Sequence, residues 1–280
     1  MTDGFILINK EEGKTSNDVV QEAKKILKVK KVGHLGTLDP IAEGLLILAI
    51  NKATKFSSYF LESDKSYEVK LKLGQSTDTD DSSGKVIFES NINPSEKKIQ
   101  ENLFSFIGES MQKPPFFSAL KYQGKPLYKY AREGQFIEKP ARKIFIKKIN
   151  NFEYDEKVCS FTVYCSKGTY IRSLARDLGE KLKCGAHMTS LRRVSQHNFN
   201  ISESVNILEI SKEKIIPIEK AFNNLNKIII NSEDSKKFIN GVKNIYNNNF
   251  DNLYRILNNE GIFLGIGQIK ENHLKHKQLV

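Results

Sequence analysis

The segment GHLGTLDP, residues 33–40, holds the residue whose type and setting most suggest catalysis. Two glycines and a proline make it a tight loop, its only ionisable side chains are His34 and Asp39, and the apolar run LLILAI follows it closely. An Asp-Pro pair in such a loop is often no more than a turn device. Loops that flank a rigid strand also carry catalytic side chains, however, and no stronger nucleophile lies nearby in the sequence. Asp39 is therefore the candidate nucleophile.

The elements around this loop follow from the hydrophobic pattern of the chain. Apolar residues recur at helical spacing after residue 15, with Ser16 or Asn17 as the expected helix cap. The segment YEVKLKLG alternates strictly, which predicts a half-buried strand with Tyr67 on its buried face. The same reasoning predicts strands at residues 5–10, 45–50, 67–74, 144–149 and 158–165, and helices at residues 15–31, 94–108 and 168–182.

The order of these elements predicts the fold class. Short strands mixed with helices through residues 1–222 predict an α+β domain with a mixed or antiparallel sheet flanked by helices. Residues 112–142 mix basic residues with tyrosines, prolines and glycines and follow no period, so we expect a long excursion from the sheet. Residues 223–280 predict a small β-rich domain, which contains LYRILNNEGIFLGIGQI, two apolar runs around a turn that predict a hairpin.

The composition is that of a folded chain with an excess of basic residues. The 280 residues include 44 Lys and Arg against 33 Asp and Glu, which gives a formal net charge of +11. This excess either reflects a Lys- and Asn-rich genome or indicates a polyanionic partner, because phosphates neutralised by Lys and Arg release counterions.

The compartment follows from what the sequence lacks. Its longest strongly apolar run, Leu45 to Ile50, is far too short to span a bilayer, and its N-terminus does not read as a secretory signal. Three cysteines without a CxxC pair, Cys159, Cys165 and Cys184, predict neither a disulfide framework nor a zinc site. We therefore expect a cytoplasmic protein without membrane contact.

Two other signals for a metal site are weak. His273 and His276 form HLKH near the C-terminus, where a solvated tail is the simpler interpretation. The acidic residues Asp78, Asp80 and Asp81 could bind Mg²⁺. A surface turn with exposed carboxylates explains them better, so the sequence predicts no metal site.

The segment GHLGTLDPIAEGLLILAINKATKF resembles the catalytic motif of the TruB-type bacterial tRNA pseudouridine synthases. Further blocks agree in the family's order: INKEEGKTSNDVV, SYEVKLKLGQSTDTDDSSG, KPPFFSALKYQGKPLYKYAREG and CSKGTYIRSLARDLGEKLKCGAHMTSLRR. The resemblance implies the pseudouridine-synthase fold with a small PUA-like C-terminal domain. The activity that it implies is isomerisation of uridine to pseudouridine at position 55, in the T-arm loop of tRNA, after base flipping.

The resemblance also implies a role for each matching residue. Asp39 matches the nucleophilic aspartate, and Arg172 matches the arginine that forms an ion pair with it. Without the motif, Arg172 would be interpreted as a helix-surface residue, and Tyr67 as a strand core residue. The substrate-binding matches are Tyr67, which stacks on the flipped uracil, Tyr170, which contacts the base or sugar, His34, which helps keep the base extruded, and Leu191, which forms an apolar wall.

The excursion at residues 112–142 matches a segment that closes over the T-arm in this family. Its basic residues alternate with tyrosines and are candidates for contacts with the RNA backbone: Lys121, Lys125, Lys129 and Arg132. We expect no cofactor, because the isomerisation has no net redox change and a carboxylate can hold the detached fragment. The sequence leaves open whether Asp39 attacks C1′ of the sugar, adds to C6 of the uracil or takes part in an elimination.

The sequence departs from the family pattern at two places. The usual KPxG becomes Lys10-Glu11-Glu12-Gly13, and a tyrosine common before SALK is Phe117 here. The main alternative function is a tRNA-binding folding factor with secondary catalysis, and a guide-RNA-dependent relative of the dyskerin type is disfavoured because no long basic extension is present. We expect a monomer that binds the T-arm stem-loop of tRNA and needs no obligate protein partner.

Overall fold

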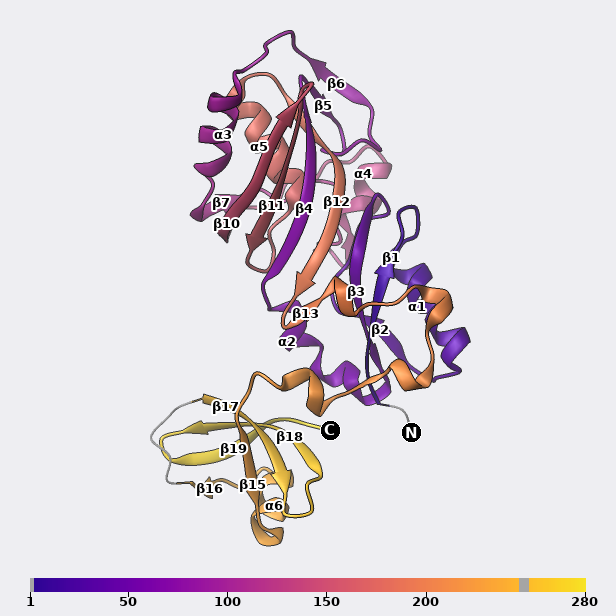
Figure 1. Ribbon diagram of the computed structural model, residues 1–280, viewed down its shortest axis with the longest axis vertical. Coiled ribbons are helices and arrows are strands. Elements are labelled where there is room, and N and C mark those ends of the chain that lie inside the picture. The colour runs from indigo at the N-terminus through magenta and orange to yellow at the C-terminus, as the bar shows by residue number, and fades with distance from the viewer. Residues whose placement is uncertain (1–2, 247–251) are drawn as a thin grey trace.

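The computed structural model describes residues 3–246 and 252–280, and Figure 1 shows that its two main sheets lie apart. The larger sheet has ten strands, eight of them in the order β14-β1-β3-β12-β4-β11-β10-β7, while β2 pairs with β3 and β13 with β12. Its strands are β1 Gly4–Lys10, β2 Val32–His34, β3 Ala42–Ile50, β4 Lys65–Leu73, β7 Gly108–Gln112, β10 Arg142–Asp155, β11 Val158–Cys165, β12 Ala186–Gln196, β13 Phe199–Asn200 and β14 Ile216–Pro217.

Both faces of this sheet are covered at β1 and β3, which explains why β3 is apolar throughout. The α-helices of this part are α1 Ser16–Leu27, α2 Ser57–Leu61, α3 Glu96–Phe104, α4 Leu127–Arg132 and α5 Ile171–Leu182. Helices α1, α3 and α5 pack against one face, where Leu46 and Leu48 of β3 belong to the same buried cluster. Leu45 and Ile47 point to the opposite face, which is covered by α2 and by the 3₁₀ helices η1 Asn51–Phe56 and η5 Glu219–Phe222.

The predicted mixed α+β fold is confirmed. Within the described residues, every pair of neighbouring strands in the large sheet is antiparallel except β3 with β12, which is parallel. All of the predicted strands and helices are present, and β4 buries Tyr67 as the alternation predicted. The parallel register places Leu191 of β12 opposite Ala42 at the start of β3, so the end of the GHLGTLDP loop lies beside the SLRR segment.

Two details of the helix predictions are wrong. Thr15, not Ser16 or Asn17, caps α1: its hydroxyl accepts a hydrogen bond from the Asp18 backbone N–H at 3.1 Å, and Asp18 accepts one from the Thr15 N–H at 2.9 Å. The helix expected at residues 94–108 ends at Phe104, because the chain turns there toward β7. Gly108, which starts β7, has φ of 106°, a conformation that favours glycine.

The excursion leaves the sheet at the end of β7 and returns to it at the start of β10, Arg142. It contains the hairpin of β8 Lys121–Tyr122 and β9 Lys125–Pro126, followed by α4. A second hairpin outside the large sheet joins β5 Gln75–Thr77 to β6 Val86–Glu89. The short 3₁₀ helices η2 Ile201–Glu203, η3 Ile207–Glu209 and η4 Lys212–Lys214 lead from β13 to β14.

The C-terminal part is a five-stranded sheet with one helix, drawn at the lower left of Figure 1. Its elements are β15 Lys227–Ile230, α6 Ser232–Ile239, β16 Asn244–Ile245, β17 Asn252–Asn258, β18 Phe263–Lys270 and β19 His273–Leu279. The predicted hairpin is confirmed as β17 and β18. The expectation of a solvated tail for His273 and His276 is wrong, because both lie in β19, where His276 Nδ1 is 2.8 Å from the Phe238 carbonyl oxygen.

The C-terminal sheet packs against the rest of the chain. Ile266 of β18 belongs to the same buried cluster as Phe5, and the Phe263 ring centroid lies 6.5 Å from that of Phe56. This cluster contains residues from both sides of position 222, so it does not mark a boundary there. The division into domains at 1–222 and 223–280 therefore stays a prediction. Among the helices that the structure describes, none has the length and apolarity needed to cross a membrane.

Candidate active site

The loop that carries Asp39 connects β2 to β3 and is held in place by the start of α1. The Ser16 hydroxyl accepts a hydrogen bond from the Leu38 N–H at 2.8 Å and donates one to the Leu38 carbonyl at 3.0 Å. The Gly13 N–H donates to the Pro40 carbonyl at 2.8 Å. The INKEEGKTSNDVV block therefore packs against the loop that carries Asp39, and the missing proline of KPxG does not prevent this contact.

Arg172 forms an ion pair with Asp39, as the motif predicted. Its Nη2 atom lies 2.9 Å from Asp39 Oδ2. The Arg172 side chain is 6% exposed and that of Asp39 is 35% exposed, so the guanidinium is buried while the carboxylate can be reached by a ligand. The interpretation of Arg172 as a helix-surface residue is therefore wrong. Its position near the start of α5 turns it inward, toward the loop between β2 and β3.

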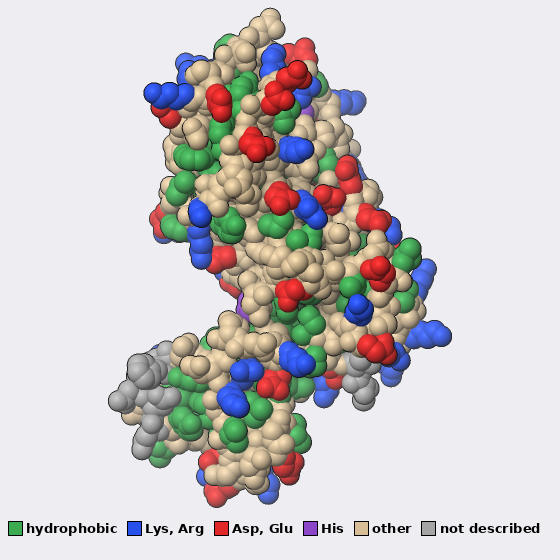
Figure 2. All heavy atoms as spheres, viewed as in Figure 1, with side chains coloured by type: hydrophobic (Ala, Val, Ile, Leu, Met, Phe, Trp, Pro, Cys, Tyr) green, Lys and Arg blue, Asp and Glu red, His purple; other side chains and the backbone are tan. Residues whose placement is uncertain are grey.

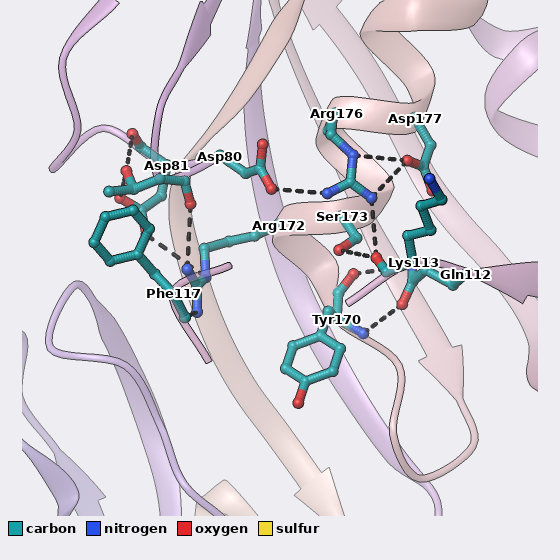
Figure 3. A network of polar contacts seen from close by, with 11 residues as sticks. Asp80, Asp81, Gln112, Lys113, Phe117, Tyr170, Arg172, Ser173, Arg176 and Asp177 are labelled. Atoms are coloured by element: carbon teal, nitrogen blue, oxygen red, sulfur yellow. Dashed lines mark hydrogen bonds and ion pairs between the residues drawn. The ribbon is translucent and has the colours of Figure 1, made fainter. Parts of the chain in front are cut away.

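Three further groups fix the Arg172 guanidinium (Figure 3). It donates to the Phe117 carbonyl at 2.8 Å and to the Thr79 carbonyl at 3.2 Å, and its Nε lies 3.6 Å from Asp81 Oδ2. Because an arginine has five N–H donors in a rigid plane, these partners leave its head group little freedom. The orientation of Arg172, and through it that of Asp39, is set by two separate segments of the chain, the loop between β5 and β6 and the excursion.

The acidic loop is not the exposed turn that the sequence suggested. Asp81 is buried and lies beside Arg172, and Asp80 lies 3.1 Å from Arg176 (Figure 3). Burial raises the pKa of Asp80 to about 6, and the neighbouring Arg176 opposes this shift. Asp81 is thus a residue of the site that sequence reasoning missed. Its position inside the matching block SYEVKLKLGQSTDTDDSSG was the available signal.

Two cavities meet at the Asp39–Arg172 pair, and both residues line each of them. The smaller, about 310 Å³, is also lined by Tyr67, Tyr170 and Leu191. The larger, about 720 Å³, includes His34 in its wall, and Arg132 as well. The structure therefore brings together all six residues that the resemblance assigned to catalysis and substrate binding. Of the basic candidates in the excursion, Arg132 lines a described cavity, whereas Lys121, Lys125 and Lys129 lie outside both.

Opposite Tyr67, on the neighbouring strand β12, lies a buried arginine, Arg193. Arg193 is fully buried, donates to the Leu45 carbonyl at 2.7 Å and to the Gly36 carbonyl at 3.1 Å, and thereby ties β12 to the catalytic loop. Burial raises the pKa of Tyr67 to about 12, against the effect of Arg193, so its hydroxyl stays protonated. Arg193 was also missed in the sequence, although it is the second arginine of SLRR.

Tyr170 and His34 are placed by different neighbours. The Gln112 side chain forms two hydrogen bonds with the backbone of Tyr170. It accepts one from the Tyr170 N–H at 2.8 Å and donates one to the Tyr170 carbonyl at 3.1 Å. The base of the excursion is therefore joined to the start of α5. Burial and the charge of Arg193 lower the pKa of His34 below its ordinary value of 6.5, so its ring is neutral at neutral pH.

Lys10, from the INKEEGK block, is a buried amine close to the site. It is 1% exposed and donates to the carbonyls of Glu11 at 2.8 Å and Lys14 at 2.7 Å. Burial lowers its pKa to about 8, against the attraction of the Asp39 carboxylate.

This shift predicts a pH dependence of stability. Between about pH 8 and the ordinary lysine pKa of 10.5, the unfolded chain holds a proton that the folded chain has lost, so raising the pH stabilises the folded state. The free energy of unfolding of the wild type, relative to Lys10→Met, should rise by about 3 kcal/mol across this range. Denaturant unfolding of both proteins at each pH measures the difference. A difference that stays flat or falls would contradict the assignment.

Comparisons with known proteins agree with this geometry. Residues 24–171 match the family model of the TruB family pseudouridylate synthase N-terminal domain. Residues 172–235 match the tRNA pseudouridylate synthase B C-terminal domain, and residues 227–280 match the C-terminal model of pseudouridine synthase II TruB.

Curated relatives and solved structures extend the likeness over the whole chain. The tRNA pseudouridine synthase B of Clostridium acetobutylicum is 44% identical over 98% of both chains, and that of Wigglesworthia glossinidia brevipalpis is 41% identical over 96% of this chain and 86% of its own. A structure of a Cbf5–Nop10–Gar1 complex superposes with a TM-score of 0.74 at 25% identity, covering 99% of this chain and 85% of that one. The matches to both parts of the family model, and to relatives along their full length, show that the chain belongs to the TruB family of pseudouridylate synthases.

Proposed function

We propose that this chain isomerises uridine to pseudouridine at position 55, in the T-arm loop of tRNA, with Asp39 as the nucleophile. The relatives' names give the reaction and the class of substrate. The observation that carries the assignment of Asp39 is its ion pair with the buried Arg172, at the point where both cavities meet. The proposed place of action is the cytoplasm.

The chemistry suits a single carboxylate. The C1′–N1 bond breaks and a C1′–C5 bond forms, while C5 loses a proton and N1 gains one, so atoms and electrons balance without a redox partner. The Arg172 guanidinium lies 2.9 Å from the Asp39 carboxylate and orients its oxygens. Attack at C1′, addition to C6 and assistance of an elimination all remain compatible with this placement of Asp39.

The smaller cavity suits the flipped base. Extrusion of a nucleotide from its stack costs a few kcal/mol, which contacts inside the enzyme must offset. Tyr67 offers an aromatic ring for stacking on the uracil, Leu191 an apolar wall, and Tyr170 a contact to base or sugar. His34, in the larger cavity, is placed to fill the gap that the base leaves in the T-loop.

The RNA backbone contacts are proposed for the excursion at residues 112–142. On the face drawn in Figure 2, basic side chains are interspersed with acidic ones, so net charge alone does not mark a binding surface there. Within the excursion, Lys125 is already paired with Glu133 at 2.6 Å, and the Arg132 guanidinium lies 5.5 Å from the Tyr128 ring centroid. Lys121 and Lys129 are exposed and have no ion pair among the described residues, which leaves them available to phosphates.

Neutralising these two lysines should weaken tRNA binding and reduce its salt dependence. In the variant Lys121→Gln/Lys129→Gln, the slope of log K against log salt concentration should fall by about 0.7–0.9 for each phosphate that is no longer neutralised. Binding of a T-arm hairpin across a salt series measures this slope. The control is Lys97→Gln/Lys98→Gln, a pair of exposed lysines on α3, which should keep the wild-type slope. An unchanged slope in the first variant would refute the proposed role of these lysines.

The variant Asp39→Asn distinguishes an enzyme from a tRNA-binding folding factor through two measurements, the rate of pseudouridine formation and the affinity for RNA. Asp39→Asn removes the nucleophile but keeps the size of the side chain, so pseudouridine formation in a T-arm hairpin should fall by at least about 10³-fold. The dissociation constant for the hairpin should change by less than about threefold, since the shape of the site is kept. Asp64→Asn, an exposed aspartate paired with Lys147 outside both cavities, is the control. Conversion of uridine by Asp39→Asn at the wild-type rate would show that the mechanism is wrong.

The oligomeric state proposed is a monomer without an obligate protein partner. The support for this proposal is that Asp39 and Arg172 pair within a single chain.

A further inference from the structure

We infer that the Ser118 hydroxyl donates a hydrogen bond to a carbonyl oxygen of the extruded uracil, before and after the base turns over. This inference rests on the proposed function and deepens it, because it names a group that holds the base during the isomerisation. Ser118 begins the SALK segment, in which sequence reasoning gave a role to Lys121 but none to Ser118.

The first observation is a buried hydroxyl without a partner. Ser118 is 4% exposed, and its Oγ makes no hydrogen bond to any residue that the structure describes. A buried hydroxyl left unpaired destabilises the folded protein, so nearly all such groups have a partner. A ligand can supply that partner when the group faces a binding cavity.

The second observation is the location of Ser118. It lines both cavities, as Asp39 and Arg172 do, and so it stands in the wall that the two cavities share. In the smaller cavity it shares the lining with Tyr67 and Leu191, between which the uracil is proposed to lie. Burial raises the pKa of Tyr170, and the nearby Ser118 hydroxyl opposes this rise through hydrogen bonding, although the geometry gives the Ser118 Oγ no partner within hydrogen-bond distance.

The backbone around Ser118 is fixed on both sides. The Phe117 carbonyl accepts a hydrogen bond from Arg172 at 2.8 Å, so the residue before Ser118 is tied to the arginine that holds Asp39. The Ser118 N–H donates to the Phe116 carbonyl at 3.0 Å, and the Ser118 carbonyl accepts from the Tyr128 N–H at 3.1 Å. The hydroxyl is therefore held at a set position relative to the carboxylate.

The symmetry of uracil suits one fixed donor. When the detached ring turns by half a rotation about the axis through N3 and C6, C5 takes the place of N1, and the two carbonyl groups at C2 and C4 exchange places. A hydroxyl that faces one carbonyl position therefore meets an oxygen acceptor in both orientations. Ser118 can hold the base in the plane of reaction without favouring the starting orientation over the product one.

The test compares Ser118→Ala and Ser118→Thr with the wild type on T-arm hairpins that carry uridine, 2-thiouridine or 4-thiouridine at the target position. Sulfur accepts hydrogen bonds more weakly than oxygen. We expect Ser118→Ala to slow the single-turnover rate on uridine about five- to tenfold, which is the effect of one hydrogen bond. Replacement of a uracil carbonyl oxygen by sulfur should lower the single-turnover rate of the wild type and of Ser118→Thr. It should lower the rate of Ser118→Ala much less, because alanine has no hydroxyl to donate.

A second buried serine provides the control. The Ser173 hydroxyl on α5 already donates to the Lys113 carbonyl at 2.9 Å, so Ser173→Ala removes a buried hydroxyl that does not reach the base. Any loss of rate in Ser173→Ala should leave the effect of sulfur as large as in the wild type. The inference is overturned if Ser118→Ala shows the wild-type effect of sulfur, or matches the wild-type rate on uridine. A wild type that forms no pseudouridine would instead overturn the proposed function, and the inference with it.

Discussion

The ion pair between Arg172 and Asp39, at 2.9 Å, is the contact on which the rest of the site depends. As the proposed nucleophile, Asp39 needs a positive charge beside it and a fixed orientation of its oxygens. A buried guanidinium satisfies both conditions. It needs partners of its own, however, because a buried charge without them is costly.

The fold supplies those partners from segments far apart in the sequence. Thr79 and Asp81 come from the loop between β5 and β6, Phe117 from the excursion, and Arg172 from α5. Antiparallel pairing of β4 with β11 and β12, together with the parallel pairing of β12 and β3, draws these segments to one side of the catalytic loop. The large mixed sheet thus supplies His34, Tyr67 and Leu191 from its own strands, and it holds the loop of Asp39 and the start of α5 beside them.

Much of this could be predicted from the sequence, because the strands carry strong local patterns. The alternation around Tyr67 and the continuous apolar run of β3 indicate half-buried and fully buried strands, and both are confirmed. Asp39 and Arg172 were identified through motifs rather than through any local physical signal. These two residues lie close together only in the folded chain, because β3 pairs with β12. The hydrophobic periodicity of the sequence does not show this pairing.

What could not be predicted is the burial of polar residues. Asp81 lies in a loop that was interpreted as a surface turn, and Arg193 in a segment where only Leu191 was given a role, yet each is buried because a distant group satisfies it. The sequence predicted that residues 112–142 leave the sheet, but it predicted neither the hairpin and helix that this excursion contains nor its pairings, such as Lys125 with Glu133. Local sequence reports which residues prefer water, whereas the partners that overcome this preference come from other parts of the fold.

The most direct test of the central ion pair is the single-turnover rate of Arg172→Lys at saturating T-arm RNA. Lysine keeps the charge but has three donors at one point, and cannot reach the four partners that the planar guanidinium contacts. The account predicts a rate at least about 100-fold below wild type, with RNA affinity within about threefold. Arg176→Lys, one helical turn further along α5 and outside both cavities, should stay close to wild type. A rate for Arg172→Lys within about twofold of wild type would contradict the account.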